Sequence, residues 1–181
     1  MTATEYVVLV DSDDREIGIA PKMEAHQKGL LHRAFSVFIF NTTTNELLLQ
    51  QRADHKYHSP GLWTNACCSH PRHNESILEA GKRRLKEELG LITSLKQVGT
   101  FQYQAYFENG LSENELDHLL IGAISNQTRF HPNPDEVKAI RWITRDALQH
   151  ELKTHPHQFT PWLLLALEKL SAVDWKTVTK R

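Results

Sequence analysis

A cysteine and a histidine two positions apart are the residues of this sequence with the clearest capacity for chemistry. Cys68 and His70 stand in the segment WTNACCSHP, directly before a stretch that contains an Arg-Arg and a Glu-Glu pair. A thiol beside basic groups and a metal ion has an altered proton affinity and can give or take a proton. A cysteine is also often only a small buried apolar residue, and Cys67 fits that description. The segment alone leaves both interpretations of Cys68 open.

Two histidines and a pair of glutamates elsewhere in the chain add side chains that metal sites use. His26 and His32 lie upstream of the cysteine, and Glu113 and Glu115 lie downstream of it, two residues apart. On an extended segment these two carboxylates point to the same face. Together with His70 they would fill most of an octahedral shell for a borderline divalent cation such as Zn²⁺ or Mn²⁺.

Many pairs of this kind arise by chance, because the sequence holds 11 histidines. A histidine without a specific reason to act as a ligand is more often a surface residue or a hydrogen-bonded one. We expect that outcome for the remaining histidines, which are His55, His58, His73, His118, His131, His150, His155 and His157.

Four basic residues from separate segments could supply local positive charge for an anionic ligand. They are Lys22, Arg52, Lys56 and Arg84. Arg84 stands one helical turn before Glu88, so the two side chains share a helix face. Mg²⁺ prefers one or two carboxylates together with water and phosphate oxygens, and arginine offers a forked donor to the same phosphate. This pair favours a phosphorylated ligand with Mg²⁺, whereas Arg83 and Glu87 have the spacing of an ordinary surface ion pair.

A series of strands and a few helices must position these residues. Segments 5–11, 17–20, 33–41 and 46–52 have the apolar pattern and turn signals of strands, and 33–41 is apolar on both faces. We expect further strands at about 98–107, 117–125 and 137–143. Short helices are expected at 21–26, 144–152 and 160–170, where proline or threonine stands at the start.

The segment 76–89 is the clearest helix. Ser76 and Glu79 have the spacing of a capping box, and Gly90 is placed to end the helix in a left-handed conformation. Its apolar stripe consists of Ile77, Gly81, Leu85 and Leu89, with Leu78 beside it. The glycine within that stripe predicts a close approach of another backbone or side chain. Strands on both sides of a central helix, with more helices at the end, indicate a mixed α+β layered domain.

Length and composition favour one domain that binds neither nucleic acid nor membrane. The chain has 181 residues, 40% hydrophobic residues and a net charge of -1, so no global field attracts either partner. We expect a single domain over residues 1–181 with a core at about 5–172. The N-terminal segment MTATEYVVLVDSDD lacks the basic region and the apolar length of a signal or membrane segment. The only two cysteines are adjacent, which favours a reduced, cytoplasmic setting.

The helix and the segment before it resemble the Nudix box. In register with that motif are Glu75, Arg83, Leu85, Glu87, Glu88, Gly90 and Leu91. Two positions depart from it: Ser69 stands where the box has its first glycine, and Arg84 where it has a glutamate. An arginine in place of a metal-binding glutamate, with a thiol upstream, indicates a site that differs from an ordinary Nudix hydrolase.

From about Tyr6 to Leu170, the sequence is similar to the type 1 isopentenyl-diphosphate isomerases, Nudix-superfamily enzymes of isoprenoid synthesis. The resemblance rests on the order and spacing of several motifs: His26 and His32, RAFSVFIFN, RADHKYHSPGLWTNACCSHP, the modified Nudix helix, SENE and FTPW. It implies a Nudix-like mixed sheet in α/β/α layers. It also implies interconversion of isopentenyl and dimethylallyl diphosphate through a tertiary carbocation.

The resemblance assigns a role to each candidate residue. The implied catalytic residues are Cys68, Glu115, Tyr103 and Trp162, and the family pattern Trp-Thr-Asn-x-x-Cys-x-His selects Cys68 over Cys67. Cys68 and Glu115 would exchange protons with opposite faces of the substrate, in an order left open, beside the aromatic wall of Trp162. The implied ligands of a divalent metal are His26, His32, His70, Glu113 and Glu115. The implied diphosphate-binding residues are Lys22, Arg52, Lys56 and Arg84, with Mg²⁺ held by Glu88 and the carbonyl of Cys68.

Two divalent metals and a small diphosphate are thus the implied ligands. One metal, Mn²⁺, Zn²⁺ or Mg²⁺, would fill the His/Glu site, and Mg²⁺ would accompany the diphosphate. The chain would be a monomer or a weak homodimer. Two other interpretations remain: a Nudix pyrophosphohydrolase, which requires glutamate at position 84 and has no use for Cys68, and a non-catalytic binding module. The latter would tolerate the loss of Cys68, Glu115 and Glu88.

Overall fold

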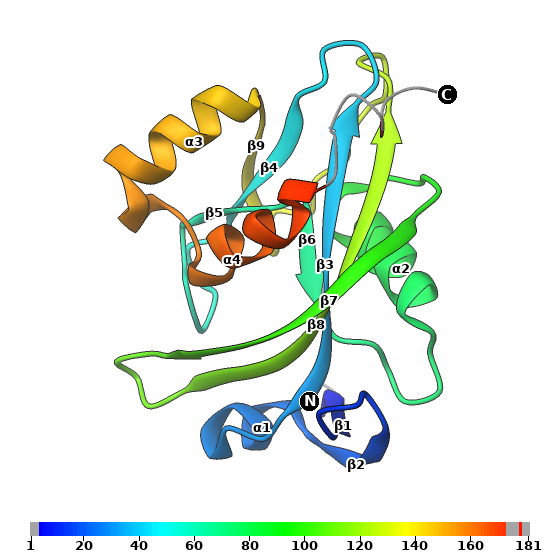
Figure 1. Cartoon of the computed structure of the whole chain (residues 1–181), viewed down its shortest axis with the longest axis vertical. Coiled ribbons are helices and arrows are strands. Elements are labelled where there is room, and N and C mark those ends of the chain that lie inside the picture. Colours follow the sequence, from blue (N-terminus) through cyan, green and yellow to red (C-terminus); the bar gives the residue numbers. More distant parts are fainter. Residues whose placement is uncertain (1–3, 173–177, 179–181) are drawn as a thin grey trace.

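The computed structural model describes residues 4–172 and residue 178, and it arranges them as one sheet with helices on both sides (Figure 1). The strands are β1 (Tyr6–Val10), β2 (Glu16–Pro21), β3 (His32–Asn41), β4 (Leu47–Arg52), β5 (Trp63–Thr64), β6 (Cys67–Ser69), β7 (Lys96–Tyr106), β8 (Ser112–Ile124) and β9 (Val137–Ile143). The helices are α1 (Lys22–Lys28), α2 (Ile77–Leu89), α3 (Arg145–Thr154) and α4 (Pro161–Lys169), with 3₁₀ turns at Pro156–Gln158 and Leu170–Ala172. Within these described ranges, no helix has both the length and the apolar content to cross a membrane.

Strand β3 is the centre of the sheet. Along one edge it pairs in parallel with β8, from His32 opposite Glu115 to Asn41 opposite Ile124. Along its other edge it meets β1, β6 and β4 in turn, each antiparallel. Strand β7 extends the sheet beyond β8, and β9 and β5 pair with β4. Parallel and antiparallel pairs in one sheet, with helices packed on it, confirm the expected mixed α+β class.

The two faces of β3 pack against different helices, which explains why this strand is apolar on both sides. Val37 and Ile39 belong to a buried cluster that includes the inner face of α2. Phe38 and Phe40 belong to a second cluster that includes the inner face of α4. Helix α2 therefore covers one side of the sheet and α4 the other (Figure 1). This arrangement confirms the expected α/β/α layers.

Helix α2 forms for the local reasons expected from its sequence. Ser76 and Glu79 form the reciprocal capping box, and Gly90 ends the helix with φ of 65°. Gly81 faces the sheet so closely that a Cβ atom would lie 2.6 Å from a side-chain carbon of β8. Leu78 was expected beside the buried stripe but is 37% exposed, because it points away from the sheet. Helix α2 thereby presents its Arg84 side to the site without losing its apolar contact.

Two short polar segments are strands where other structure was expected. Strand β8 begins at Ser112 and not near 117, so the SENE segment lies within a strand. Cys68 lies in the short strand β6, paired with Ser36 of β3, in a segment for which the sequence predicted no strand. Both segments lack the apolar alternation that marks a strand, because their inward-facing side chains are polar site residues. The other expected strands and helices lie within a few residues of their predicted bounds.

Candidate functional site

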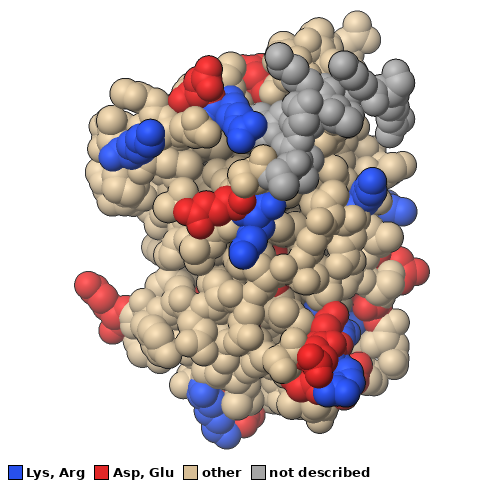
Figure 2. Space-filling model, viewed as in Figure 1, with Lys and Arg blue, Asp and Glu red and all other residues tan. Residues whose placement is uncertain are grey.

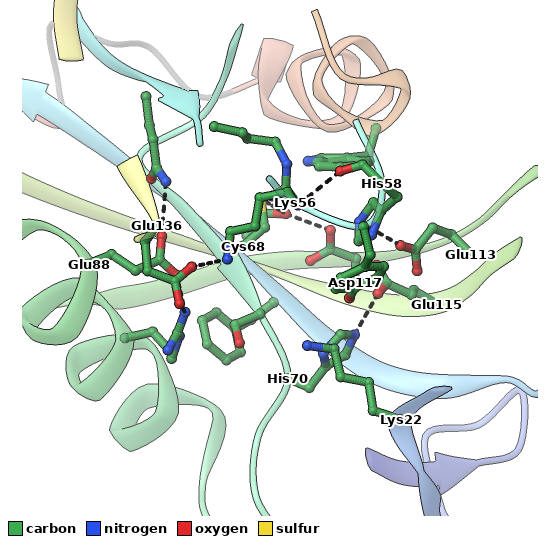
Figure 3. Close-up of a pocket in the computed structure, with 18 of the residues that line it drawn as sticks. Lys22, Lys56, His58, Cys68, His70, Glu88, Glu113, Glu115, Asp117 and Glu136 are labelled. Atoms are coloured by element: carbon green, nitrogen blue, oxygen red, sulfur yellow. Dashed lines mark hydrogen bonds and ion pairs between the residues drawn. The ribbon is translucent and has the colours of Figure 1, made fainter. Parts of the chain in front are cut away.

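A small cavity lies where β3, β6 and β8 meet α2 and α4, and most of the expected site residues form its walls (Figure 3). Its volume is about 60 Å³. The expected residues that line it are Lys22, Arg52, Lys56, Cys68, His70, Arg84, Glu88, Tyr103, Glu113, Glu115 and Trp162. His26 and His32 lie behind this wall, with ring centroids 5.6 and 5.0 Å from that of His70. A larger hollow of about 670 Å³ adjoins the cavity and shares Lys22, Lys56 and Arg84 with it.

The three imidazoles and Glu113 bring one ligand atom each to within 4.8 Å of all the others. Strand register explains this cluster, because His32 of β3 lies opposite Glu115 of β8, and Glu113 precedes it by two residues. Glu115 Oε1 is 2.7 Å from His70 Nε2 and 3.5 Å from His32 Nε2. Such a set of nitrogen and carboxylate ligands suits a borderline divalent cation.

Two buried atoms of this cluster, His26 Nε2 and Glu113 Oε2, have no hydrogen-bond partner among the described residues. His26 Nδ1 and His32 Nδ1 each donate to a main-chain carbonyl, at 3.1 and 2.7 Å. In its neutral form each ring therefore carries its lone pair on Nε2, the atom that faces the cluster. Burial and the charge of Glu115 raise the pKa of Glu113 to about 7, and a bound cation would offset both effects. The residues present thus fit a divalent metal ion.

The Cys68 thiol has two polar neighbours deep in the cavity. It donates to Asn65 Oδ1 at 3.0 Å, and its sulfur is 3.5 Å from Ser36 Oγ. The Ser36 hydroxyl in turn donates to Asp117 Oδ2 at 2.6 Å. Burial and the negative charge of Asp117 raise the pKa of Cys68 to about 12. At neutral pH the sulfur therefore carries a proton.

Trp162 of α4 is held by the same segment that positions the thiol. Its indole Nε1 donates to Thr64 Oγ1 at 3.1 Å, and Thr64 donates to Asn65 Oδ1 at 3.0 Å. Asn65 Nδ2 donates to two main-chain carbonyls, at 3.0 and 2.9 Å, which leaves its Oδ1 as the acceptor. A chain of hydrogen bonds thereby joins the indole to the Cys68 thiol. The ring of Trp162 is 3% exposed and lines the cavity.

Glu115 has its two oxygens in different environments. Tyr103, its partner across the β7–β8 pair, donates to Oε2 at 2.5 Å, whereas Oε1 faces His32 and His70. Burial alone would raise the pKa of Glu115, but hydrogen bonds from the two histidines outweigh it and hold the pKa well below its ordinary value. Burial raises the pKa of Tyr103, so the phenol stays neutral and donates. The cavity therefore contains a protonated thiol and an ionised carboxylate, the two groups that a proton transfer needs.

Two basic residues of the cavity, Arg84 and Lys56, are paired with carboxylates. Arg84 Nη2 lies 2.7 Å from Glu88 Oε1 and 3.2 Å from Glu136 Oε1, and Lys56 also bonds to Glu136. On the molecular face in Figure 2, by contrast, positive and negative side chains are scattered without a patch of one sign. The cavity wall itself holds four Lys and Arg side chains and five carboxylates, so its positive charge is not in excess. Glu88 and Glu136 partly neutralise this positive charge. A bound metal ion or anionic ligand must displace these carboxylates or share them.

Several residues of the cavity wall were not singled out from the sequence. His58, expected at the surface or capped, lines the cavity with a side chain that is only 9% exposed, and its Nε2 lies 3.0 Å from Glu113 Oε1. Asp117 could have been found, because it continues the alternation of Glu113 and Glu115 along β8. The other unexpected wall residues are Phe35, Ser36, Gln50, Tyr57 and Glu136, together with Ser69, which was noted only as a departure from the Nudix box.

Two residues that were expected to lie outside the site, Arg83 and His118, can also be compared with the structure. Arg83 does contact Glu87, at 3.3 Å, but it binds Glu75 more closely, at 2.7 Å. His118 is buried and has partners, since its Nδ1 lies 2.9 Å from Gln97 Nε2. Neither residue lines the small cavity, although Arg83 lines the larger hollow beside it.

The chain is similar to proteins of one family over nearly its whole length. The NUDIX domain model matches residues 30–163. The chain is 46% identical to "Isopentenyl-diphosphate Delta-isomerase" of Serratia proteamaculans (strain 568) over 168 residues, which are 93% of this chain and 92% of that protein. It is 47% identical to the protein of the same description from Aliivibrio fischeri (strain MJ11), covering 92% and 95% of the two chains. The corresponding protein of Burkholderia multivorans (strain ATCC 17616 / 249) is 47% identical, with coverage of 91% and 92%.

Solved structures share the fold at much lower identity. A crystal structure of a Deinococcus radiodurans protein superposes with a TM-score of 0.72 at 16% identity, covering 91% of this chain and 98% of that one. A MutT protein from Methanosarcina mazei Go1 gives a TM-score of 0.63 at 15% identity, with coverage of 78% and 94%. These likenesses concern the fold alone.

Proposed function

Since this chain belongs to the isopentenyl-diphosphate Delta-isomerase family of the NUDIX superfamily, we propose that it interconverts isopentenyl and dimethylallyl diphosphate. The observation that carries this proposal is that Cys68 and Glu115 line one cavity, roofed by Trp162 and backed by the His/Glu cluster. This constellation lies outside the helix that carries the Nudix motif, and a pyrophosphohydrolase has no use for it.

The reaction needs one proton donor and one proton acceptor. Protonation of the terminal alkene carbon of isopentenyl diphosphate forms a C–H bond and leaves a tertiary carbocation on the neighbouring carbon. Removal of a proton from the methylene group on the other side of that carbon forms the new double bond. Cys68, a thiol at neutral pH, and Glu115, a carboxylate, supply the two complementary protonation states. Their order in each direction stays open.

Orientation of Glu115 comes from both of its oxygens. Tyr103 holds Oε2, and Oε1 faces the imidazoles of His32 and His70. A divalent cation held by those histidines, His26 and the two glutamates would supply positive charge that keeps the carboxylate ionised and fixed. Mn²⁺, Zn²⁺ and Mg²⁺ remain the candidates, because the donor set is compatible with each to a different degree.

A cation in the cavity requires stabilisation without a nucleophile that would trap it. The face of an indole attracts a cation by about 2 kcal/mol or more in a desolvated site. Trp162 is buried, and its indole N–H is bonded to Thr64, so its orientation is fixed before substrate binds. The guanidinium of Arg52, 5.6 Å from the centroid of this ring, already makes such a contact.

We assign the diphosphate to Lys22, Arg52, Lys56 and Arg84, with Mg²⁺ held by Glu88 and the main-chain carbonyl of Cys68. The larger hollow that shares Lys22, Lys56 and Arg84 offers room for the charged end. The cavity itself is lined by four Lys and Arg side chains and five carboxylates, so a diphosphate needs further positive charge from metal ions. Binding energy from this end would hold the alkene against the catalytic groups.

The decisive experiment is a direct assay. Purified protein with isopentenyl diphosphate and Mg²⁺ is expected to yield dimethylallyl diphosphate, detected by acid-labile product or by NMR. Release of inorganic phosphate, or of nucleoside monophosphate from nucleoside diphosphate derivatives, without isomerisation would favour the hydrolase interpretation instead. Isomerase activity that survives the loss of Cys68, Glu115 and Glu88 would reject the assigned residues.

We further infer that residues 1–181 act as one domain, as a cytoplasmic monomer or weak homodimer that needs no nucleic acid or membrane. The continuous sheet and the absence of a membrane-crossing helix within the described ranges support this inference. Sedimentation of the active protein across a range of concentrations would measure its oligomeric state, and a stable higher oligomer would contradict it.

A further inference from the structure

We propose that His58 is a positioning residue of the metal site, which holds Glu113 so that its second oxygen faces the cation. This inference rests on the proposed His/Glu metal site but adds a residue outside the implied ligand set. His58 lies on the segment between β4 and β5, whereas Glu113 belongs to β8 (Figure 3). Contact between the two therefore depends on the tertiary fold.

The contact between these two side chains is close and largely shielded from water. His58 Nε2 lies 3.0 Å from Glu113 Oε1, and the side chains are 9% and 3% exposed. An ionised carboxylate can only accept, so His58 must carry its proton on Nε2 in this contact. A polar contact to a carboxylate is stronger in such a shielded place than at an exposed one, because water does not compete for it.

The imidazole of His58 is fixed by aromatic neighbours. Its ring centroid is 4.3 Å from that of Tyr57, 5.4 Å from that of Phe107 and 5.7 Å from that of Trp162. Such packing on several sides restricts the ring to one orientation. Glu113 is thereby tied to a rigid group and not merely to a mobile side chain.

Fixing one oxygen of Glu113 determines the direction of the other. Oε1 is engaged by His58, and the buried Oε2 has no hydrogen-bond partner among the described residues. Oε2 lies 3.2 Å from His26 Nδ1, an atom that already donates to a main-chain carbonyl. His58 thus leaves Oε2 directed at the cluster, where a cation would bind. Outer groups that orient a ligand in this way commonly contribute 10- to 100-fold, or about one to two orders of magnitude, in metal affinity.

The main chain of His58 makes a separate contact that a substitution would leave in place. Its carbonyl accepts a hydrogen bond from Arg52 Nη2 at 3.3 Å. Arg52 is one of the proposed diphosphate-binding residues. A side-chain substitution at position 58 should therefore change metal affinity far more than it changes the KM for the diphosphate substrate. A general disruption of the cavity would change both.

The test measures Mn²⁺ binding to the metal-stripped full chain, with free Mn²⁺ followed by electron paramagnetic resonance. His58→Phe keeps an aromatic ring but loses the N–H donor, and His58→Gln keeps an N–H donor of similar reach. His150→Phe, on the exposed side of α3, is the matched control. We expect the Mn²⁺ dissociation constant to rise about 10- to 100-fold in His58→Phe and only a few-fold in His58→Gln. The control should match the wild type.

Equal weakening in His58→Phe and His58→Gln, or no weakening in His58→Phe, would overturn the proposal. Saturating Mn²⁺ should restore kcat in His58→Phe, with KM for isopentenyl diphosphate within a few-fold of the wild-type value. A wild-type chain that binds no Mn²⁺ or Zn²⁺ would overturn both the metal site and this role of His58. If the wild type and the variants show the expected ranking of Mn²⁺ affinities but the wild type lacks isomerase activity, only the proposed function would be overturned.

Discussion

The indole nitrogen of Trp162 donates a hydrogen bond to the hydroxyl of Thr64 at 3.1 Å, although the two residues are 98 positions apart. Thr160 donates a hydrogen bond to the same hydroxyl at 2.9 Å, and the Thr64 hydroxyl in turn donates to Asn65 Oδ1 at 3.0 Å. Asn65 Oδ1 also accepts from the Cys68 thiol. One hydroxyl with two donors and one acceptor is fully satisfied. Thr64 therefore sets the aromatic wall and the thiol in a fixed relation to each other.

Replacing Thr64 by valine should uncouple these two groups. The change leaves the buried N–H of Trp162 and the hydroxyl of Thr160 without their acceptor, each at about 1–3 kcal/mol. We expect a loss of unfolding free energy of that order in urea denaturation and a shift of the Trp162 indole resonance in ¹⁵N NMR. Thr64→Ser, which keeps the hydroxyl, should retain both properties. An unchanged indole resonance in Thr64→Val would contradict the hydrogen bond.

Removal of the sulfur should abolish isomerase activity at Cys68 but not at the adjacent Cys67. Cys68→Ala removes the thiol that lines the cavity and should abolish isomerisation while metal binding persists, because the ligand role assigned to this residue uses its main-chain carbonyl. Cys67 is fully buried, and its sulfur lies 3.5 Å from Glu88 Oε1. Cys67→Ala should cost about 1 kcal/mol of stability through a small cavity and keep most of the activity. Product formation under saturating substrate measures the activity of the two variants. Loss of activity in Cys67→Ala but not in Cys68→Ala would show that the wrong thiol was chosen.

Local patterns in the sequence were sufficient to predict the elements that scaffold the site. Strand β3 was predicted from its apolar pattern, and helix α2 from its capping residues and its apolar stripe, including the close approach at Gly81. These signals depend only on residues that are near one another in the sequence. The start of β8 was missed for a physical reason. Its first residues turn polar side chains inward, where Glu113 and Glu115 face histidines instead of an apolar core. The usual signal of a buried strand is therefore lacking at the site.

Residues whose role depends on tertiary contacts could not be predicted in the same way. His58 resembles any other histidine of a polar loop, and only the folded chain surrounds it with Tyr57, Phe107 and Trp162. Glu136 likewise follows a turn-forming segment, yet it contacts both Arg84 and Lys56. The roles of the motif residues came from resemblance to a family, and they stay predictions until the variants are measured.

Arg84 distinguishes the isomerase from a hydrolase, because it replaces a glutamate of the Nudix box. Arg84→Glu would bring a third carboxylate beside Glu88 and Glu136 and remove a forked phosphate donor. A hydrogen bond to a charged group contributes about 1.5–3 kcal/mol, so KM for isopentenyl diphosphate should rise about 10- to 100-fold. Arg83→Lys, on the neighbouring pair with Glu75, should leave KM near the wild-type value. A gain of phosphate release in Arg84→Glu with unchanged KM would instead support a hydrolytic site.

The imidazole of His58, which is only 9% exposed, should make the metal-free chain sensitive to acid. Burial and the positive charge of Arg52 lower the pKa of His58 from 6.5 to about 3. His58 therefore binds a proton below pH 6.5 in the unfolded chain, whereas in the folded chain it stays neutral down to about pH 3. This contribution to stability is complete above pH 6.5 and is lost as the pH falls toward 3, at up to about 1.4 kcal/mol per pH unit.

His58→Gln removes this titration but keeps a donor to Glu113, so its unfolding free energy should fall less steeply with acid. Urea denaturation in a chelator between pH 7 and pH 4 would measure the slope, which should decrease by up to about 1.4 kcal/mol per unit. His150→Gln, exposed on α3, should keep the wild-type slope. Glu113 faces His58 and has a raised pKa, so its charge is itself lost over this range and cannot hold the imidazolium in the folded state. Identical slopes for His58→Gln and the wild type would mean that His58 is protonated as readily in the folded chain as in the unfolded one.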